Sequence, residues 1–384
     1  MKALQKFMDK VRPNFQKGGK YQYLHSTFDA FDTFLFVPGH VTKKGSHIRD
    51  GVDLKRTMFL VVIAAVPALL FGMWNVGYQH FLNINETATF METFFYGFWK
   101  VIPLVIVSYV VGLGVEFIFA QMRGHEVNEG YLVSGFLIPL IIPVSTPLWM
   151  VALATIFAVI IGKEVFGGTG MNIVNPALLA RAFLFFAYPS QMSGDKVWIA
   201  DQVDGTSGAT PLGHLLTATD KLPELPSVME SFIGTIPGSV GETSTLAILI
   251  GAVILLFTGI ASWRVMLSVF AGGYLMGLVF NLVGANAYMT LPAHMHLLIG
   301  GFAFGAVFMA TDPVSAAQTN RGKYIYGFLI GLMAVLIRVV NPAYPEGMML
   351  AILLLNVFAP LIDHYVIAGN IKRRMKRMKK IVVQ

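Results

Sequence analysis

Long apolar segments alternate with short polar ones over most of the chain. The first begins at Thr57 and runs to about Tyr78 without a charged residue, and a second runs from about Trp99 to Phe119 with Glu116 inside it. An apolar segment of about 20 residues is long enough to cross the hydrocarbon core of a bilayer as a helix. The pattern therefore predicts membrane-spanning helices.

Three closely spaced prolines interrupt the next apolar segment. Residues 131–162 carry few polar groups, but Pro139, Pro143 and Pro147 fall in the middle of them. A helix cannot keep its hydrogen bonds through three prolines at this spacing. We expect a short span to about Ile142, a tight turn, and a new span from Leu148.

Six more candidate spans bring the total to about ten. They cover 174–188, 245–262, 265–284, 297–311, 324–340 and 347–368. The predicted fold is an all-α polytopic membrane protein with interrupted helices. Its predicted divisions are a polar N-terminal segment, a first five-helix group, a polar loop, a second five-helix group and a basic tail, at 1–56, 57–189, 190–244, 245–369 and 370–384.

The distribution of charge predicts the orientation. Basic residues gather in the first 56 residues and again from Lys372 to Lys380, whereas the loop 190–244 holds seven acidic residues against only Lys196 and Lys221. Basic flanks mark the cytoplasmic side of a membrane protein. An even number of spans puts both termini in the cytoplasm, and the acidic loop after five spans then faces outside.

An internal repeat recurs at an offset of 166 residues. The segment starting at Leu132 matches the one starting at Leu298, Thr146-Pro147 matches Asp312-Pro313, and Asn175-Pro176-Ala177 matches Asn341-Pro342-Ala343. Because five spans per half is odd, the two halves must be inverted relative to each other. Inverted repeats with broken helices are a common scaffold for sites near the middle of the membrane.

Composition excludes several classes of function. Hydrophobic residues make up 55% of the 384 residues and charged residues only 13%, about half the usual share in soluble proteins, which excludes a cytosolic globular enzyme. The chain has no cysteine, so it holds no disulfide, thiolate nucleophile or cysteine-bound iron–sulfur cluster. The net charge of +7 belongs to the membrane-flanking ends, and we expect no nucleic-acid partner.

The outer loop contains a run of small residues, Asp204-Gly205-Thr206-Ser207-Gly208-Ala209-Thr210-Pro211-Leu212. Small neighbours leave a hydroxyl accessible to an enzyme that modifies it. By itself, the run is also typical of an ordinary solvated turn.

Ser207-Gly208-Ala209-Thr210 resembles the flavinylation motif of the membrane-embedded B subunit of the Na+-translocating NADH:quinone oxidoreductase, which the D subunit of the related Rnf complex shares. Further similar segments span nearly the whole chain, and the N-terminal one favours the quinone reductase over Rnf. They are Val41–Lys43 through Val52–Arg56, His125–Gly130, Gly162–Gly170, Ala310–Ser315 and Arg338–Met349.

The resemblance implies two flavins. Thr210 would carry FMN as a phosphoester on the outer side, with Ser207 and Gly208 as its neighbours in the motif. The family also holds a non-covalent riboflavin, for which Asn172 and Asn175 are candidates because an amide can pair with the edge of a flavin ring. The Gly167–Gly170 run fits neither the dinucleotide nor the Walker pattern, and a close-packed turn explains it equally well.

The repeat suggests that the two flavin sites are pseudo-symmetric. Asn175 would lie near the inner face and Asn341 near the outer face, where FMN would sit. Arg338 belongs to the same candidate site, and Arg181 and Glu164 are further charges at membrane depth that pair or hold flavin groups.

Acidic residues at membrane depth indicate an ion path. Glu116 and Asp363 correspond to family acids linked to sodium uptake, although interfacial solvation explains either one alone. Asp312 either caps the turn that follows it or lines the same path. Sodium as the transported ion suits carboxylate and carbonyl oxygens.

Two glycines before Glu116 resemble the quinone region of the family. The family's adjacent Gly-Gly is Gly112-Leu113 in this chain, with Gly114 next, so quinone contact is expected at Gly112 and Gly114. His294 and His296, and the His125–Glu129 segment, do not complete a tetrahedral ligand set, and we assign them to the interface with no metal.

These inferences combine into a flavin-carrying subunit that passes electrons from FMN through riboflavin to quinone, coupled to sodium export across a bacterial inner membrane. The chain lacks a dinucleotide fingerprint, so NADH-oxidising, iron–sulfur and FMN-carrying partner subunits are expected beside the lipid bilayer. Two alternatives remain open: the D subunit of an Rnf-type ferredoxin:NAD oxidoreductase, and a non-redox channel or transporter built on inverted repeats.

Overall fold

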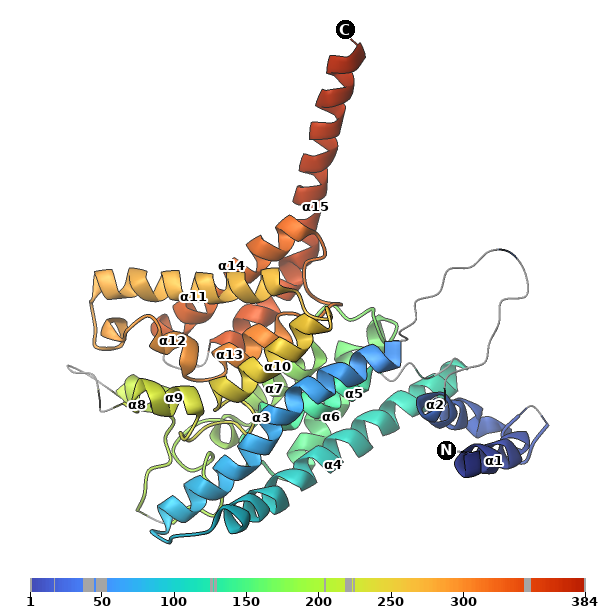
Figure 1. Ribbon diagram of the computed structural model, residues 1–384, viewed down its shortest axis with the longest axis horizontal. Coiled ribbons are helices and arrows are strands. Elements are labelled where there is room, and N and C mark those ends of the chain that lie inside the picture. Colours follow the sequence, from blue (N-terminus) through green and yellow to red (C-terminus); the bar gives the residue numbers. More distant parts are fainter. Residues whose placement is uncertain are drawn as a thin grey trace.

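The computed structural model describes residues 2–16, 18–36, 45, 54–124, 127, 130–203, 205–217, 223, 225–341 and 347–382. Every regular element in these ranges is a helix, and they contain no strand. Figure 1 shows the helices gathered into one body from which the C-terminal helix projects. The predicted all-α class is confirmed.

Six helices in the described ranges are long and apolar enough to cross a membrane. A helix rises about 1.5 Å per residue, so about 20 residues span the hydrocarbon core of about 30 Å. The six are α3 (Leu54–Asn83), α4 (Phe90–Arg123), α6 (Leu148–Gly162, extended by the short η3, Glu164–Phe166), α11 (Trp263–Val283), α14 (Asn320–Val340) and α15 (Met348–Val382).

Shorter helices occupy the other predicted spans. They are α5 (Tyr131–Leu140), α7 (Pro176–Ala187), α10 (Thr245–Phe257) and the series α12 (Met295–Leu298), α13 (Phe302–Phe304) and η6 (Gly305–Met309). Each predicted span therefore overlaps a helix, but the ten-span inverted topology stays a prediction, because these shorter helices do not reach membrane length.

The remaining helices belong to the polar segments. The N-terminal segment contains α1 (Lys2–Val11), η1 (Arg12–Asn14), η2 (Gln22–Leu24) and α2 (His25–Leu35), and the loops contain η4 (Pro189–Gln191), α8 (Pro211–Thr217), α9 (Val228–Ile233) and η5 (Tyr288–Thr290). Phe31 of α2 lies edge-on to Phe117 of α4, with ring centroids 6.0 Å apart. This contact, with Ala30 and Ala120 buried beside it, holds α2 against the end of α4.

Prolines and side-chain caps set the breaks between the shorter helices. Pro139 lies in the last turn of α5, which ends at Leu140, and α6 begins after Pro147. At the start of α7, the Asn175 side chain accepts hydrogen bonds from the backbone N–H groups of Ala177 and Leu178, with Pro176 in the first turn. Both are ordinary helix-boundary devices, and both fall where the sequence predicted a break.

Glycines allow the long helices to pack closely. A Cβ built on Gly97 of α4 would lie 1.7 Å from the backbone oxygen of Met73 in α3, and one on Gly331 of α14 would lie 2.0 Å from that of Val269 in α11. Membrane helices associate through such small residues, because lipid provides no hydrophobic driving force between them.

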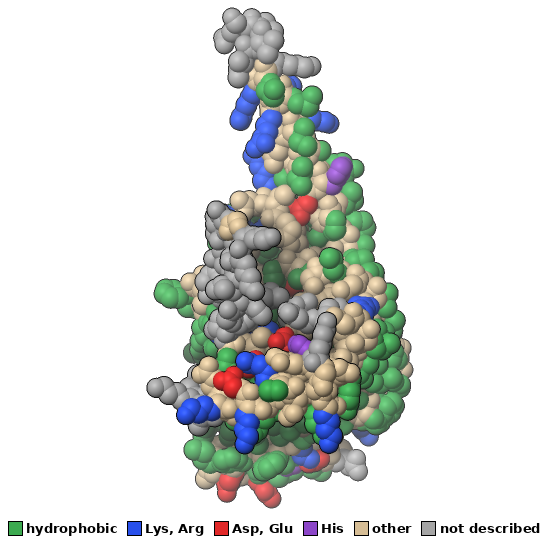
Figure 2. Space-filling view, turned by 90° about the vertical axis from the view of Figure 1, so that its right-hand side faces the viewer, with side chains coloured by type: hydrophobic (Ala, Val, Ile, Leu, Met, Phe, Trp, Pro, Cys, Tyr) green, Lys and Arg blue, Asp and Glu red, His purple; other side chains and the backbone are tan. Residues whose placement is uncertain are grey.

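The helices follow the same packing order in both halves of the chain. In the first half α4 packs on α6, and α6 on α7; in the second half α11 packs on α14, and α14 on α15. Contacts of α3 with α10 and of α7 with α15 join the two halves. Figure 2 shows apolar side chains over the flank of the body and basic ones along the projecting part of α15.

We expect Gly97→Ala to destabilise the protein by about 1–3 kcal/mol, because the new methyl group must displace the backbone of α3. Gly114→Ala is the matched control: it makes the same change on the same helix, where a Cβ meets nothing within 4 Å. Thermal unfolding in detergent should show a lower midpoint for Gly97→Ala only. Equal midpoints for the two variants would contradict the close α3–α4 crossing.

Candidate functional site

Thr210 lies at the start of α8. Its Oγ1 accepts a hydrogen bond from the backbone N–H of Gly213 at 3.2 Å, and Pro211 occupies the first helical position. Gly208 donates its N–H to the backbone oxygen of Asp195, and a Cβ at Gly208 would lie only 2.8 Å from that oxygen. The motif therefore needs glycine at 208 for close backbone packing, and it presents a half-buried threonine hydroxyl next to it.

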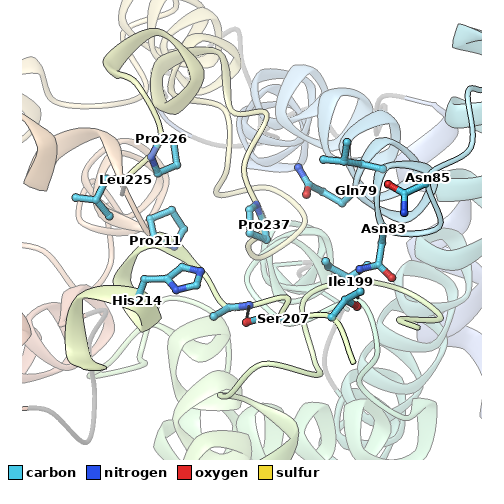
Figure 3. Close-up of a pocket in the computed structure, with 13 residues that line it drawn as sticks. Gln79, Asn83, Asn85, Ile199, Ser207, Pro211, His214, Leu225, Pro226 and Pro237 are labelled. Carbon is cyan, nitrogen blue, oxygen red and sulfur yellow. Dashed lines mark hydrogen bonds between the residues drawn. The ribbon is translucent and has the colours of Figure 1, made fainter. Parts of the chain in front are cut away.

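A cavity of about 560 Å³ opens beside this segment, and we call it the loop cavity (Figure 3). Ser207 and His214 lie on one side of it, and Gln79 and Asn83 from the end of α3 lie on the other. Thr210 itself faces a neighbouring space of about 20 Å³, while Ala209 and Pro211 on either side of it line the loop cavity.

The loop around Thr210 is fastened to the ends of α3 and α4. The Asn83 amide donates to Thr206 Oγ1 at 2.7 Å, and its oxygen accepts the Val203 N–H at 3.0 Å. Asp201 accepts from Tyr96 at 2.7 Å and from Lys100 at 2.6 Å. The hydrogen bond from the Lys100 ammonium, followed by that from Tyr96, lowers the pKa of Asp201 below its usual range.

A second cavity, of about 290 Å³, lies among the helices, and we call it the bundle cavity. Its walls are largely apolar and come from both halves of the chain, including Val61, Leu137, Leu255 and Phe308. The polar residues along it are Thr57, Ser134, Lys163, Thr169, Asn172, Asn175, Thr311 and Asp312.

Both riboflavin candidates and one ion-path candidate line the bundle cavity. The Asn172 amide donates to the backbone oxygen of Val174 at 3.1 Å, and the Asn175 amide donates to Asp312 Oδ2 at 3.3 Å. Asp312 also accepts from the Val314 N–H and from Ser315 Oγ. Asp312 therefore caps the turn that follows it, and it lines the cavity as well.

Glu116 forms a buried ion pair with Lys163, whose ammonium contacts Oε1. Thr169 Oγ1 lies 3.4 Å from the same oxygen, whereas Oε2 is buried and has no hydrogen-bond partner among the described residues. On the preceding turn of α4, a Cβ at Gly112 would lie 2.0 Å from the Tyr131 ring, while Gly114 faces open space. The two glycines of the quinone prediction thus lie in different environments.

Asp363 lies apart from the bundle cavity, on α15. One of its oxygens accepts the Gln318 N–H at 2.6 Å, and the other accepts the Thr319 N–H at 3.0 Å and Thr319 Oγ1 at 2.5 Å. Both oxygens are therefore engaged in fixing the start of α14, for which Thr319 is the N-cap.

The charges predicted at membrane depth are paired. Arg181 lies 2.8 Å from Glu242, and Glu164 lies 3.0 Å from Arg123. Arg338 is fully buried and donates to the backbone oxygens of His296 and Ile299. Asn341 is the residue at the C-terminal cap of α14.

The assignment of His296 to the interface was wrong. Its side chain is fully buried against Tyr288, because α12 turns back into the body and Gly277 of α11 leaves room for the ring. The described residues contain no group of three metal-ligating side chains. Several segments of the resemblance lie wholly or mostly outside the described residues: Val41–Lys43, Val52–Asp53, His125–Glu129, Asp204 and Pro342–Glu346.

Comparison with known proteins identifies the relatives of this chain. The sequence model of the NQR2, RnfD, RnfE family matches residues 41–372. The chain belongs to the NQR2, RnfD, RnfE family. The predicted resemblance is thereby confirmed over most of the sequence.

Curated relatives of this family member share one name, since each is called the B subunit of a Na(+)-translocating NADH-quinone reductase. The protein of Ectopseudomonas mendocina is 52% identical over 98% of the chain and 99% of its own length, and that of Chromohalobacter salexigens is 50% identical over 96% and 95%. The protein of Pseudomonas aeruginosa is 48% identical over 98% and 99%. The relatives are thus named as subunits of an enzyme complex, as the resemblance implied.

Sequence reasoning gave no role to several residues that line the sites of this family member. His214, Gln79 and Asn83 line the loop cavity, and Lys163 lines the bundle cavity. Lys163 carried a usable signal, since a lysine directly after an apolar span is costly to bury without a partner.

We expect Asp363→Ala to destabilise this family member by about 1–3 kcal/mol, because it leaves the N–H groups of Gln318 and Thr319 without their acceptor. Asp363→Asn, which keeps one acceptor oxygen, should lose less. Thermal unfolding of the purified protein in sodium-free buffer measures both losses. An unchanged midpoint for Asp363→Ala would argue against a structural clamp.

Proposed function

We propose that the chain is the flavin-carrying membrane subunit of a Na+-pumping NADH:quinone oxidoreductase. The observation that carries the proposal is Thr210: it stands in the flavinylation motif, and its neighbours Ala209 and Pro211 line the loop cavity. The name shared by relatives about 50% identical over nearly their whole length supports the quinone reductase over Rnf.

Thr210 would hold FMN through a phosphoester, and the bound flavin supplies one- and two-electron redox chemistry. The loop cavity is of the size that proteins use for small ligands, which supports this assignment. Ser207 and His214 offer polar groups on the threonine side, and Gln79 and Asn83 offer amides on the α3 side. Asn83 would also orient the motif, since it already bonds Thr206 and Val203.

The bundle cavity would hold the non-covalent riboflavin. Apolar walls with a few polar groups are typical of sites for flat aromatic rings, and the Asn172 and Asn175 amides supply donors and acceptors at its edge. The predicted pseudo-symmetry would place Asn341 and Arg338 in the corresponding part of the second half.

Ten crossings would arrange the chain as two inverted five-helix repeats in a bacterial inner membrane. The matching packing order of α4, α6, α7 and of α11, α14, α15 supports the repeat. The basic projecting part of α15 and the acidic loop that carries Thr210 would then lie on opposite sides, with both termini in the cytoplasm.

Quinone would meet α4 near Gly112 and Gly114, and sodium would use Glu116, Asp312 and Asp363. The buried, incompletely bonded carboxylate of Glu116 supports its part in this path. Other subunits of the complex would oxidise NADH and deliver electrons, including iron–sulfur and FMN-carrying subunits, because this chain has neither a dinucleotide fingerprint nor a cysteine.

Thr210→Ala should abolish covalent flavin. Wild-type chain from cells that contain the flavin transferase is expected to fluoresce yellow-green after denaturing electrophoresis, and Thr210→Ala is not, since it has no hydroxyl to esterify. Thr206→Ala is the matched control, because it removes a threonine hydroxyl four residues away in the same loop and should keep the fluorescence. A non-fluorescent wild-type band would remove the redox proposal.

The absence of cysteine makes the orientation directly testable. In intact cells stripped of their outer membrane, a membrane-impermeant maleimide should label Lys196→Cys in the acidic loop but not Met378→Cys on α15, both of which are exposed positions. Opening the membrane should make Met378→Cys reactive as well. Labelling of both in sealed cells would contradict opposite placement of the loop and the tail.

A further inference from the structure

Lys163 stands between two features of the structure. It follows the last residue of α6, and its side chain is only 4% exposed. Its ammonium pairs with Glu116, and the same residue lines the bundle cavity. Glu116 does not line that cavity, so Lys163 and Thr169 are the side chains that connect the carboxylate to it.

Glu116 differs from the other two acids of the predicted ion path. Asp312 and Asp363 each accept hydrogen bonds on both carboxylate oxygens. Glu116 accepts only on Oε1, and its buried Oε2 has no partner among the described residues. A buried carboxylate oxygen without a partner is costly, and it offers a ligand position to a small hard cation.

The bundle cavity contains one cationic and one acidic side chain among its described lining residues, Lys163 and Asp312. Because the rest of the wall is largely apolar, negative charge inside the cavity would interact strongly with the nearest cation. Lysine is suited to respond, since its ammonium is a compact charge on a flexible chain. Asp312 is already held by Asn175, Val314 and Ser315.

We propose that Lys163 is shared between Glu116 and the bundle cavity, so that negative charge arriving in the cavity draws the ammonium away and frees Glu116 to bind one Na+. The inference rests on the proposed function for the source of that charge. One electron passes from the reduced FMN on Thr210 to the ring in the cavity and adds one negative charge there. Lys163 keeps its proton throughout, and the Na+ restores the charge balance at Glu116.

Binding of Na+ by the purified complex tests this sharing. Isothermal titration of the oxidised and the dithionite-reduced complex, each compared with Glu116→Gln, isolates the site at Glu116. In the wild type, reduction should tighten Na+ binding at this site by about tenfold, a usual size for coupling between sites. In Lys163→Met, binding should already be tight in the oxidised complex and should not change on reduction, because the competing ammonium is gone.

Two further variants make the measurement specific. Arg123→Met removes a neighbouring cation that pairs with Glu164 and does not line the cavity, and it should behave as the wild type. Lys163→Arg keeps the charge and should retain part of the redox dependence. If Lys163→Met does not assemble, Lys163→Gln removes the charge while keeping a hydrogen-bond donor for Glu116.

Potentiometry of the non-covalent flavin supplies an independent readout. Its midpoint potential should fall in Lys163→Met and stay unchanged in Arg123→Met, because a nearby cation favours the reduced, negatively charged ring. If the flavin is present but Lys163→Met leaves both Na+ affinity and potential unchanged, the sharing of Lys163 is overturned. If the wild-type complex holds no non-covalent flavin, the proposed function of the cavity is overturned instead.

Discussion

Backbone polar groups at helix breaks need partners from the protein, because lipid offers none, and this constraint organises the structure. Arg338 crosses from α14 to satisfy the carbonyls of His296 and Ile299 near the end of α12. Asn175 caps the start of α7, and Asp363 reaches from α15 to the start of α14. The polar side chains inside the helical body therefore gather where helices end.

The same breaks create the places where ligands fit. The bundle cavity lies where the segments before α7 and after η6 meet, and its polar residues Asn175 and Asp312 are the residues that cap those segments. The loop cavity lies beside the start of α8, on a loop that Asn83 fastens to the end of α3. Interrupted helices thus give polar groups and space together, which uninterrupted apolar helices cannot do.

The sequence predicted the helix breaks well, because their causes are local. Pro139 and Pro147 act on their own helices, and Asn175-Pro176 is a recognisable helix start. The starts of the long helices were less accurate: α4 begins at Phe90 rather than near Trp99, because Thr89 and Glu92 form a capping box ahead of the apolar run. A polar first turn hides such a start from a search for apolar segments.

Partners distant in sequence could not be predicted. Lys163 meets Glu116 across 47 residues, and Arg181 meets Glu242 across 61, because α4 packs on α6 and the segment before α10 packs near α7. His296 was predicted at the interface because its neighbours His294 and Pro292 are typical of a loop, yet α12 returns it to the interior. Burial of a polar residue follows from how whole helices pack, which no local pattern contains.

The hydrogen bonds of the buried acids separate structural roles from chemical ones. Asp363 accepts on both oxygens from backbone and side-chain donors of α14, so its carboxylate is already satisfied by the fold. Arg181 and Glu242 face each other as a complete buried pair. Glu116 has a cation on one oxygen and, among the described residues, no partner on the other. Since a fold gains nothing from an unsatisfied buried oxygen, Glu116 is the acid whose position a structural role explains least.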